Sequence, residues 1–380
     1  MTEGSTTRTP QPSIRTALEE DIRVELEASD AAAYVHVGPT RDPGVRYCLA
    51  AQASGRGGHS GEDGFASDRR PLFEATVSAL AFDGEWIVET APPLSSTHPA
   101  QNLAARLAER VDGETVLTPA HIPHDSALHL ENKGFSLAST DVVARGRGTK
   151  TADERARIER AQRAAGRGIR RAASLLADAT VENDRLRLEG AELTPGRLRI
   201  AIDEGIVSAG GYPAGNTTVD PGADDGPLRS GDPIVLGASP RGAAGYYGGL
   251  VRTLVVDGEG GRERRAHVGV TQSFRSARAM LTAGAESVRS VETDLEAEIR
   301  AFGEDDAVET RVSGVGLEAM ERPVDGGDNV EPGTVVRLEA AARVGGNGWI
   351  RIADVFAKGE DGVDRLEAPS RSLEPSTVLE

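Results

Sequence analysis

The chain contains little cysteine, little lysine and few aromatic residues. Cys48 is the single cysteine in 380 residues, which excludes an intrachain disulfide and a cysteine metal cluster. Aromatic residues make up only 4% of the chain, so we expect a core built mostly of Ala, Val, Leu and Ile. No apolar run reaches the roughly 18 residues of a membrane helix, and the N-terminus lacks the apolar stretch of a signal peptide. These absences predict a cytoplasmic protein with no membrane contact.

The charge is strongly unbalanced toward acids. Asp and Glu number 60 and Lys and Arg 43, giving a formal net charge of −17 at pH 7. This surplus argues against nucleic acid as a partner, because nucleic-acid binding needs a basic surface. Lys133, Lys150 and Lys358 are the only lysines, so arginine carries most of the positive charge. An acidic surface with so few lysines is typical of a halophilic protein, in which salt screens self-repulsion; an ordinary acidic protein is the alternative.

The length of the chain and the order of its segments predict two domains. The polar N-terminus predicts a disordered tail over 1–13. Helical and strand-like segments alternate over 14–145, which predicts a smaller α/β domain. A Gly-rich linker follows, and then a larger domain is expected over 150–368, giving an α+β fold class for the chain. We expect a flexible tail over 369–380.

Hydrophobic periodicity predicts the main elements of both domains. In the smaller domain it predicts a helix over 14–28 and buried strands over 31–37 and 45–50. In the larger domain it predicts helices at 151–176, 195–209, 262–281 and 291–302. Helix, short helix and strands therefore occur twice, at 152–257 and 262–356, which is a weak internal repeat.

The segment Gly231–Gly258 is typical of a β-hairpin, because two apolar runs flank a Gly-rich reversal. Its outline resembles the metal-binding hairpin of the prolidase, Xaa-Pro aminopeptidase and creatinase family, which are M24-type metallopeptidases. Gly231-Asp232 matches the opening turn, Gly245-Tyr246 the return, and Val251-Arg252-Thr253 the family's Thr-Arg-Thr. The resemblance implies a pita-bread fold for the larger domain, a creatinase-type N-terminal domain, and a homodimer.

The resemblance also implies where two divalent metals would be held, and most of those positions lack a ligand. The family uses two Asp, one His and two Glu, a set suited to Mn, Co or Zn, and the metal-bound water attacks the peptide. The first Asp falls on Gly237 or Ala238, of which we adopt Ala238. The remaining positions fall on Gly249 (Asp), Ser313 (His), Glu339 (first Glu) and Ala353 (second Glu). Only Glu339 retains a ligand, so we expect no metal cofactor.

Four charged residues also occupy positions matched to the family: Arg252, Glu318, Glu321 and Arg351. Buried charges persist when they are paired, so one interpretation gives these residues a structural role. The other makes them ligand-binding, with Arg252 and Arg351 holding a carboxylate in a dry cleft.

Three functions remain open. The favoured one is a metal-free pseudoenzyme that binds a peptide or small carboxylate ligand and has no catalytic residue. The second is an active Xaa-Pro aminopeptidase or dipeptidase whose metal site is rebuilt from acids such as Asp220, Asp224 and Asp225. The third is a metal-free hydrolase that uses Glu339, Glu318 or Asp354 as a general base.

Overall fold

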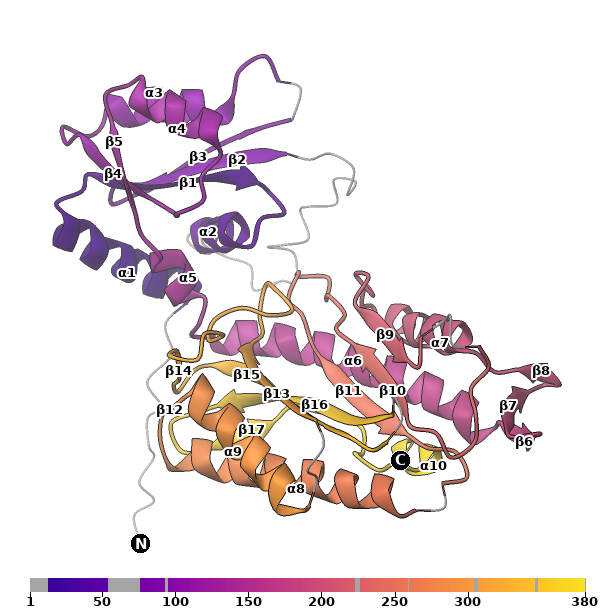
Figure 1. Ribbon diagram of the computed structural model, residues 1–380. Helices are drawn as coiled ribbons and strands as arrows, with labels where there is room; N and C mark the ends of the chain where they lie inside the picture. Colours follow the sequence, from indigo (N-terminus) through magenta and orange to yellow (C-terminus); the bar gives the residue numbers. More distant parts are fainter. Residues whose placement is uncertain are drawn as a thin grey trace, which may run out of the picture. The chain divides into compact units, whose positions relative to one another are not determined.

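The computed structural model describes residues 13–53, 76–92, 95–222, 226–258, 260–303, 307–345 and 348–379. The chain forms two compact units, Met1–Arg147 and Gly148–Glu380, whose boundary lies in the Gly-rich linker (Figure 1). The predicted N-terminal tail lies outside the described residues except for Ser13, which caps the first helix. None of the described helices combines the length and apolarity that crossing a membrane requires.

The first unit is a five-stranded sheet with helices on both faces (Figure 1). The strand order is β3-β2-β1-β4-β5; β1 pairs antiparallel with β2 and parallel with β4. The strands are β1 (Ala33–Pro39), β2 (Val77–Phe82), β3 (Trp86–Ala91), β4 (Thr115–Thr118) and β5 (Ser136–Ser139). The helices are α1 (Ile14–Ser29), α2 (Pro43–Ala53), α3 (Pro99–Ala108), α4 (His124–Glu131) and α5 (Val142–Gly146).

Residues 45–50 belong to helix α2, so the strand predicted there is wrong. The Asp42 side chain accepts a hydrogen bond from the backbone N–H of Val45 at 2.9 Å and so caps the first turn. Most of the helix is buried, including Tyr47 and Cys48. Periodicity cannot separate a short buried helix from a buried strand, because both are apolar throughout.

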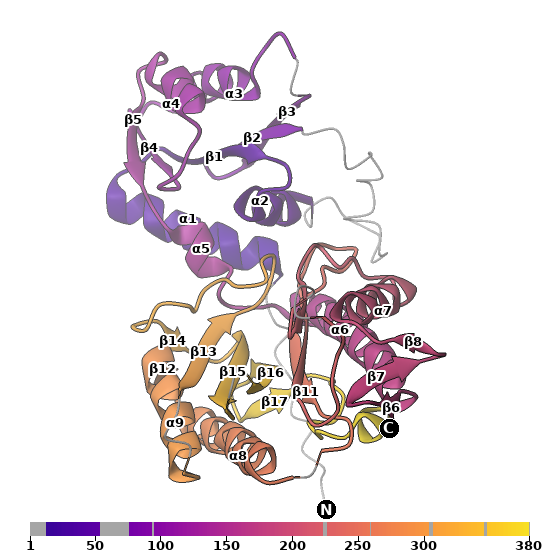
Figure 2. The same ribbon diagram turned by 45° about the vertical axis from the view of Figure 1, so that its right-hand side comes forward.

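The second unit is built on a seven-stranded antiparallel sheet covered by two pairs of helices (Figures 1 and 2). The strand order is β13-β15-β16-β11-β10-β9, with β17 also paired to β16. These strands are β9 (Thr217–Asp220), β10 (Ile234–Ala238), β11 (Leu250–Leu254), β13 (Val308–Gly314), β15 (Val335–Arg343), β16 (Trp349–Lys358) and β17 (Val363–Arg365). There are also two small sheets. One consists of β6 (Thr180–Glu182), β7 (Arg185–Leu188) and β8 (Ala191–Glu192). The other pairs β12 (Glu286–Ser287) with β14 (Asn329–Val330).

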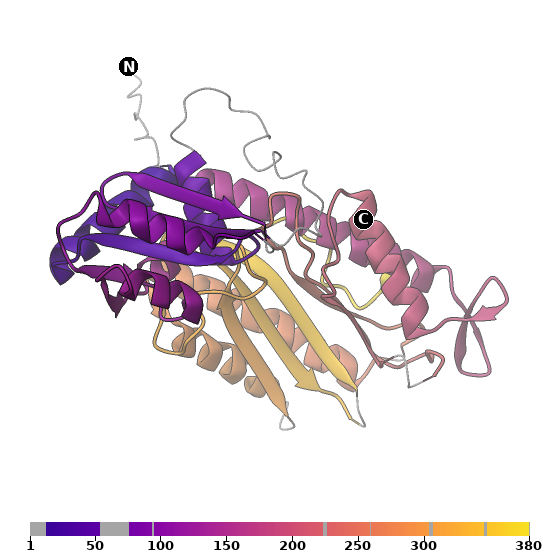
Figure 3. The ribbon, with the colours of Figure 1, turned by 90° about the horizontal axis from the view of Figure 1, so that it is seen from above.

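The two helix pairs repeat the predicted internal pattern. α6 (Ala152–Ala177) and α7 (Pro195–Ser208) pack on β10 and β11, and α8 (Arg262–Ala283) and α9 (Val288–Ala301) pack on β13, β15 and β16. Figure 3 shows the orange and yellow strands side by side, with the paler orange helices behind them. Both pairs cover the same face of the sheet, since Leu250 and Ile352 lie on the face opposite the paired Val251 and Ala353. The other face therefore carries no helix among the described residues of this unit.

Helices α6 and α7 approach so closely that only glycine fits between them. A Cβ on Gly205 would lie 2.8 Å from the Arg167 carbonyl oxygen and 2.8 Å from the Gly168 Cα. We expect Gly205→Ala to lower the free energy of unfolding by about 1–3 kcal/mol, because the helices must separate. Gly196→Ala in the same helix is the control: its Cβ would meet only the Thr194 Oγ1 at 3.9 Å. Urea denaturation of both variants tests this, and equal stabilities would contradict it.

Residues 369–379 are packed, in place of the predicted flexible tail. The Leu373 carbonyl oxygen accepts a hydrogen bond from the Val255 backbone N–H at 2.8 Å. Val378, in the short helix α10 (Pro375–Val378), is fully buried in the core shared with α6 and α7. The Pro369 carbonyl accepts a hydrogen bond from Arg252 at 2.9 Å. This segment thus completes the core of the second unit.

Candidate functional site

The helix-free face of the large sheet brings together residues that are far apart in the sequence. Because side chains alternate along each strand, paired residues of neighbouring strands share a face. The strand register places Arg311, Glu339, Ala353, Val251, Gly237 and Thr218 in one row across six strands. Ser313 and Arg337 are paired two residues away from Arg311 and Glu339, on the same face. Four of the five expected metal-ligand positions therefore lie in this area or directly beside it.

Arg337 fills the space in front of Gly249. A Cβ on Gly249 would lie 3.2 Å from the Cδ and 3.6 Å from the Nε of Arg337. The guanidinium then reaches Glu339, and its Nη2 donates to the Glu339 Oε2 at 2.6 Å. Burial lowers the pKa of Arg337, Glu339 offsets part of this, and Arg351 and Arg311 lower it further. Arginine nevertheless remains a cation in a protein, so this position carries a fixed positive charge.

Glu339 is held between two arginines. Arg337 binds one carboxylate oxygen, and the Nη1 of Arg351 donates to the other at 2.6 Å. Arg351 also pairs with Glu309 and lies over the Trp349 ring, 5.5 Å from its centroid. Burial lowers the pKa of Arg351, but the hydrogen bonds to Glu339 and Glu309 outweigh this and raise it overall. The Glu339 carboxylate therefore has both oxygens engaged by charged donors.

A cavity of about 350 Å³ opens beside this cluster. Its lining includes Gly237, Ser239, Arg311, Ser313, Arg337 and Glu339. Val251 and Met320 add apolar surface to the same wall. The cavity therefore combines cationic side chains, serine hydroxyls and apolar surface, a mixture that suits a small ligand with a charged group.

The sequence model of metallopeptidase family M24 matches residues 156–358, more than half of the chain. The chain belongs to this family. The comparison with curated protein sequences gave no match. The M24 resemblance expected from the central hairpin is thus confirmed.

Solved structures of M24-like peptidases share the fold over nearly the whole chain. Prolidase from Pyrococcus horikoshii OT3 has a TM-score of 0.70 at 16% identity, covering 94% of this chain and 99% of that chain. Xaa-Pro dipeptidase from Bacillus anthracis has a TM-score of 0.72 at 13% identity, with 94% and 99% covered. Escherichia coli aminopeptidase P carrying His243Ala has a TM-score of 0.64 at 15% identity, with 97% and 98% covered. The predicted pita-bread fold is confirmed.

The side chains around Glu339 do not fit the two divalent metals that M24 membership implies. Gly249, Ser313 and Ala353 supply no carboxylate or imidazole at the expected positions. Glu339 itself is already neutralised by two arginines. Within the described ranges, no group of three or more His, Cys, Asp and Glu could hold a metal ion. Asp220 ends the edge strand β9, and Asp224 and Asp225 lie outside the described residues, so no rebuilt site is seen among the groups described.

Gly237, and not Ala238, lies on the face that carries the other expected ligand positions, which corrects the choice of Ala238. Ala238 is 1% exposed and its side chain packs in the core beneath α6 and α7. Gly237 pairs with Val251 and lies on the helix-free face. A Cβ on Gly237 would come 2.3 Å from the Thr218 Oγ1, so even a small side chain there would displace Thr218. Strand alternation, which separates neighbouring residues onto opposite faces, decides between the two.

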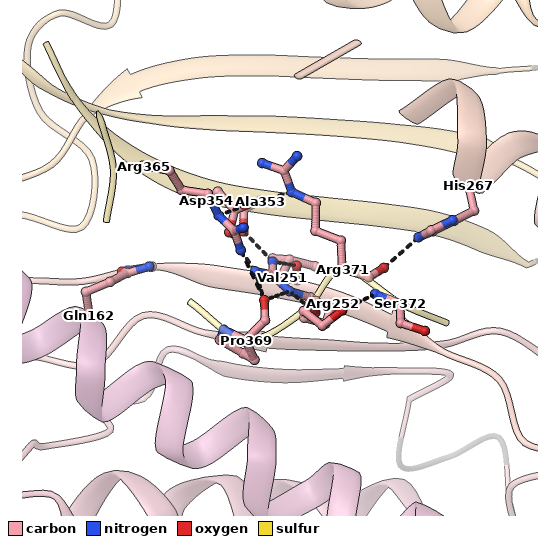
Figure 4. Close-up of polar contacts among 12 residues, drawn as sticks. Gln162, Val251, Arg252, His267, Ala353, Asp354, Arg365, Pro369, Arg371 and Ser372 are labelled. Atoms are coloured by element: carbon pink, nitrogen blue, oxygen red, sulfur yellow. Dashed lines mark hydrogen bonds and ion pairs between the residues drawn. The ribbon is translucent and has the colours of Figure 1, made fainter. Parts of the chain in front are cut away.

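Arg252 does not share a cleft with Arg351, which corrects the predicted carboxylate pair. Arg252 is fully buried on the helix-covered face, where it binds Asp354 at 2.6 Å (Figure 4). All of its N–H groups donate within the protein: to Asp354 and to the carbonyl oxygens of Val251, Ala353, Pro369 and Ser370. Arg252 is therefore structural. Asp354, on the same buried side, is equally unsuited to act as a base for a ligand in the cavity.

Glu321 is likewise held within the protein. Its Oε1 pairs with the Lys150 Nζ at 2.8 Å, and both side chains are almost fully buried. Its Oε2 accepts from the backbone N–H of Glu318 at 3.3 Å, while the Glu318 side chain is exposed. Gly316 makes room for this pair, because a Cβ there would lie 2.0 Å from the Glu321 Oε1. The contacts of Glu321 stabilise this loop, so its carboxylate is not available to bind a ligand.

Arg337 and Arg311 are the site residues that sequence reasoning missed. Arg337 lies two residues before Glu339 on β15, and Arg311 is the partner of Glu339 on β13. The period of two along a strand places Arg337 on the same face as Glu339 and was the available signal. Arg311 could not be found in this way, because its closeness to Glu339 depends on the register between two strands.

Proposed function

We propose that this M24 chain is a metal-free pseudoenzyme that binds a peptide or small carboxylate in the cavity beside Glu339 without hydrolysing it. The observation that carries this is the Arg337 side chain, which fills the space in front of Gly249 and binds Glu339. At roughly 4 Å and an effective dielectric constant of about 20, a guanidinium repels a divalent cation by about 8 kcal/mol. One arginine-bound carboxylate does not offset that cost.

The names of the similar structures suggest the ligand to test. They include prolidases and an Xaa-Pro dipeptidase, so a dipeptide ending in proline is the first candidate. A free carboxylate would meet the fixed positive charge of Arg337 and Arg311, and charge-assisted hydrogen bonds to guanidinium are among the stronger polar contacts. The homodimer, the cytoplasmic location and the salt adaptation stay predictions of the sequence.

The test is to measure binding and turnover of alanyl-proline on the same purified protein. Calorimetry without added metal is expected to show saturable binding, and Arg337→Met is expected to abolish it. Chromatography is expected to detect no proline release after addition of Mn, Co or Zn. Metal-dependent release on the order of 1 s⁻¹ or faster, in the usual range for enzymes, would contradict the proposal and favour an active peptidase with a rebuilt site. Absence of binding would contradict the ligand-binding half.

A further inference from the structure

The cavity on the helix-free face is lined by more positive than negative side chains. Arg337 and Arg351 share Glu339, and Arg351 also pairs with Glu309. Arg311 is exposed, lies opposite Glu339 in the strand register, and lines the cavity. Among the residues that the structure describes, Arg311 forms no hydrogen bond or ion pair. The charged side chains that line the cavity are Arg311, Arg337 and Glu339, which leave a net charge of +1 there.

Arg337 also has hydrogen-bonding capacity that the protein does not use. Its Nη2 binds Glu339, its Nη1 makes only a long contact of 3.5 Å to the Ser239 Oγ, and its Nε has no acceptor within the described part of the chain. Arg252, by contrast, uses every N–H group. A buried donor without an acceptor destabilises the folded state. Arg337 lines the cavity, so a ligand placed there can offer its guanidinium a further acceptor.

We infer that the cavity selects a ligand with a single carboxylate, bound by Arg337 and Arg311, and that Glu339 restricts the ligand to one negative charge. This inference rests on the proposed ligand-binding function and specifies the ligand's charge. The net charge of +1 matches one monoanion. A second negative charge on the ligand would face Glu339, whose position is fixed by two ion pairs. Ser239 and Ser313 supply hydroxyl groups for the ligand's neutral polar atoms.

Glu339 acts in this scheme as an internal anion that competes with the ligand for Arg337. Glu339→Gln keeps the size of the side chain and one acceptor oxygen but removes its negative charge. The net charge of the cavity lining therefore rises from +1 to +2. Carboxylate affinity should therefore rise in this variant. A metal ligand or a general base at this position would behave in the opposite way, because its neutralisation would weaken binding or stop turnover.

The experiment compares acetyl-alanyl-proline with its C-terminal amide by calorimetry, without added metal. The wild-type protein is expected to bind the free acid roughly tenfold more tightly than the amide. Glu339→Gln should strengthen binding of the free acid several-fold and should allow malonate, a dianion, to bind. Arg311→Met, at an exposed position, should weaken binding of the free acid more than binding of the amide.

Equal affinity of acid and amide in the wild-type protein would overturn the inference, as would weaker acid binding by a folded Glu339→Gln variant. Strong malonate binding by the wild-type protein would also overturn it, because it would show that two negative charges are accepted. These results differ from failure of the proposed function, which shows as metal-dependent proline release or as absence of any binding of alanyl-proline. Circular dichroism of each variant establishes that it is folded before its affinity is used.

Discussion

Replacing Asp354 with alanine is expected to lower the free energy of unfolding by about 3–5 kcal/mol, because it leaves a buried charge without a partner. Asp354 is fully buried and pairs with Arg252 at 2.6 Å, Arg371 at 2.6 Å and Arg365 at 3.2 Å (Figure 4). Arg252 is also fully buried and would lose its only carboxylate partner among the described residues. The network ties β11 and β16 to the C-terminal segment.

The matched control is Asp364→Ala in the neighbouring strand β17. The Asp364 side chain is 72% exposed and pairs only with Arg155 at 3.4 Å among the described residues, so its loss should change stability by no more than about 0.5 kcal/mol. Denaturant unfolding of both variants measures the difference. Equal losses in the two variants would show that the buried network adds nothing specific.

The same network predicts a loss of stability in acid. Burial alone raises the pKa of Asp354, but Arg252, Arg371 and Arg365 outweigh it and hold the pKa below its usual value. A carboxyl group with a lowered pKa stabilises the folded state fully above its unfolded pKa of about 4. That contribution is lost as the pH falls from there through the lower folded pKa. The stability gap between wild-type protein and Asp354→Ala should therefore narrow over this acidic range.

The second large effect is a gain of metal binding when Arg337 is removed and ligands are returned. A quadruple variant with Gly249→Asp, Ser313→His, Ala353→Glu and Arg337→Thr would surround Glu339 with two further carboxylates and an imidazole. These positions lie on one face of neighbouring strands, and Thr is short and suited to a strand. We expect it to bind Mn, Co or Zn stoichiometrically, because oxygen ligands with one imidazole suit these ions.

The control is the triple variant that keeps Arg337. Its aspartate at position 249 would have its Cβ 3.2 Å from the Arg337 Cδ, and the guanidinium would pair with the new acids. We expect this variant to bind no metal stoichiometrically. Equal metal content in the triple and quadruple variants would show that Arg337 does not determine whether the site binds metal.

Much of the fold could be predicted from the sequence, because its signals are local. The hydrophobic periodicity predicted helices at 151–176 and 195–209, which agree with α6 and α7 in the structure. The two antiparallel runs of the central hairpin pair in the structure as expected. The strand predicted over 45–50 was wrong because a short buried segment has no periodicity that distinguishes a helix from a strand. The flexible tail was predicted because residues 369–379 are mostly polar and contain only three large apolar residues, Leu373, Val378 and Leu379.

The candidate site was predictable in part. Motif matching found Glu339 and the absence of a ligand at Gly249, since both depend on spacing along the chain. Motif matching also found Arg252, but it could not show which face of the sheet the side chain occupies. That face follows from the pairing of Val251 with Ala353 in the folded sheet. Arg337 was overlooked because it matches no family position. Its importance comes from the contact with Gly249, a residue 88 positions earlier in the chain.

The metal content of the wild-type protein tests the central claim most directly. The chain would be equilibrated with Mn, Co or Zn, dialysed, and analysed for each element beside the quadruple variant. We predict well below one equivalent per wild-type chain, because the Arg337 guanidinium binds Glu339, the one acid among the expected ligand positions. Two equivalents per chain, the content of a dinuclear site, would contradict this account.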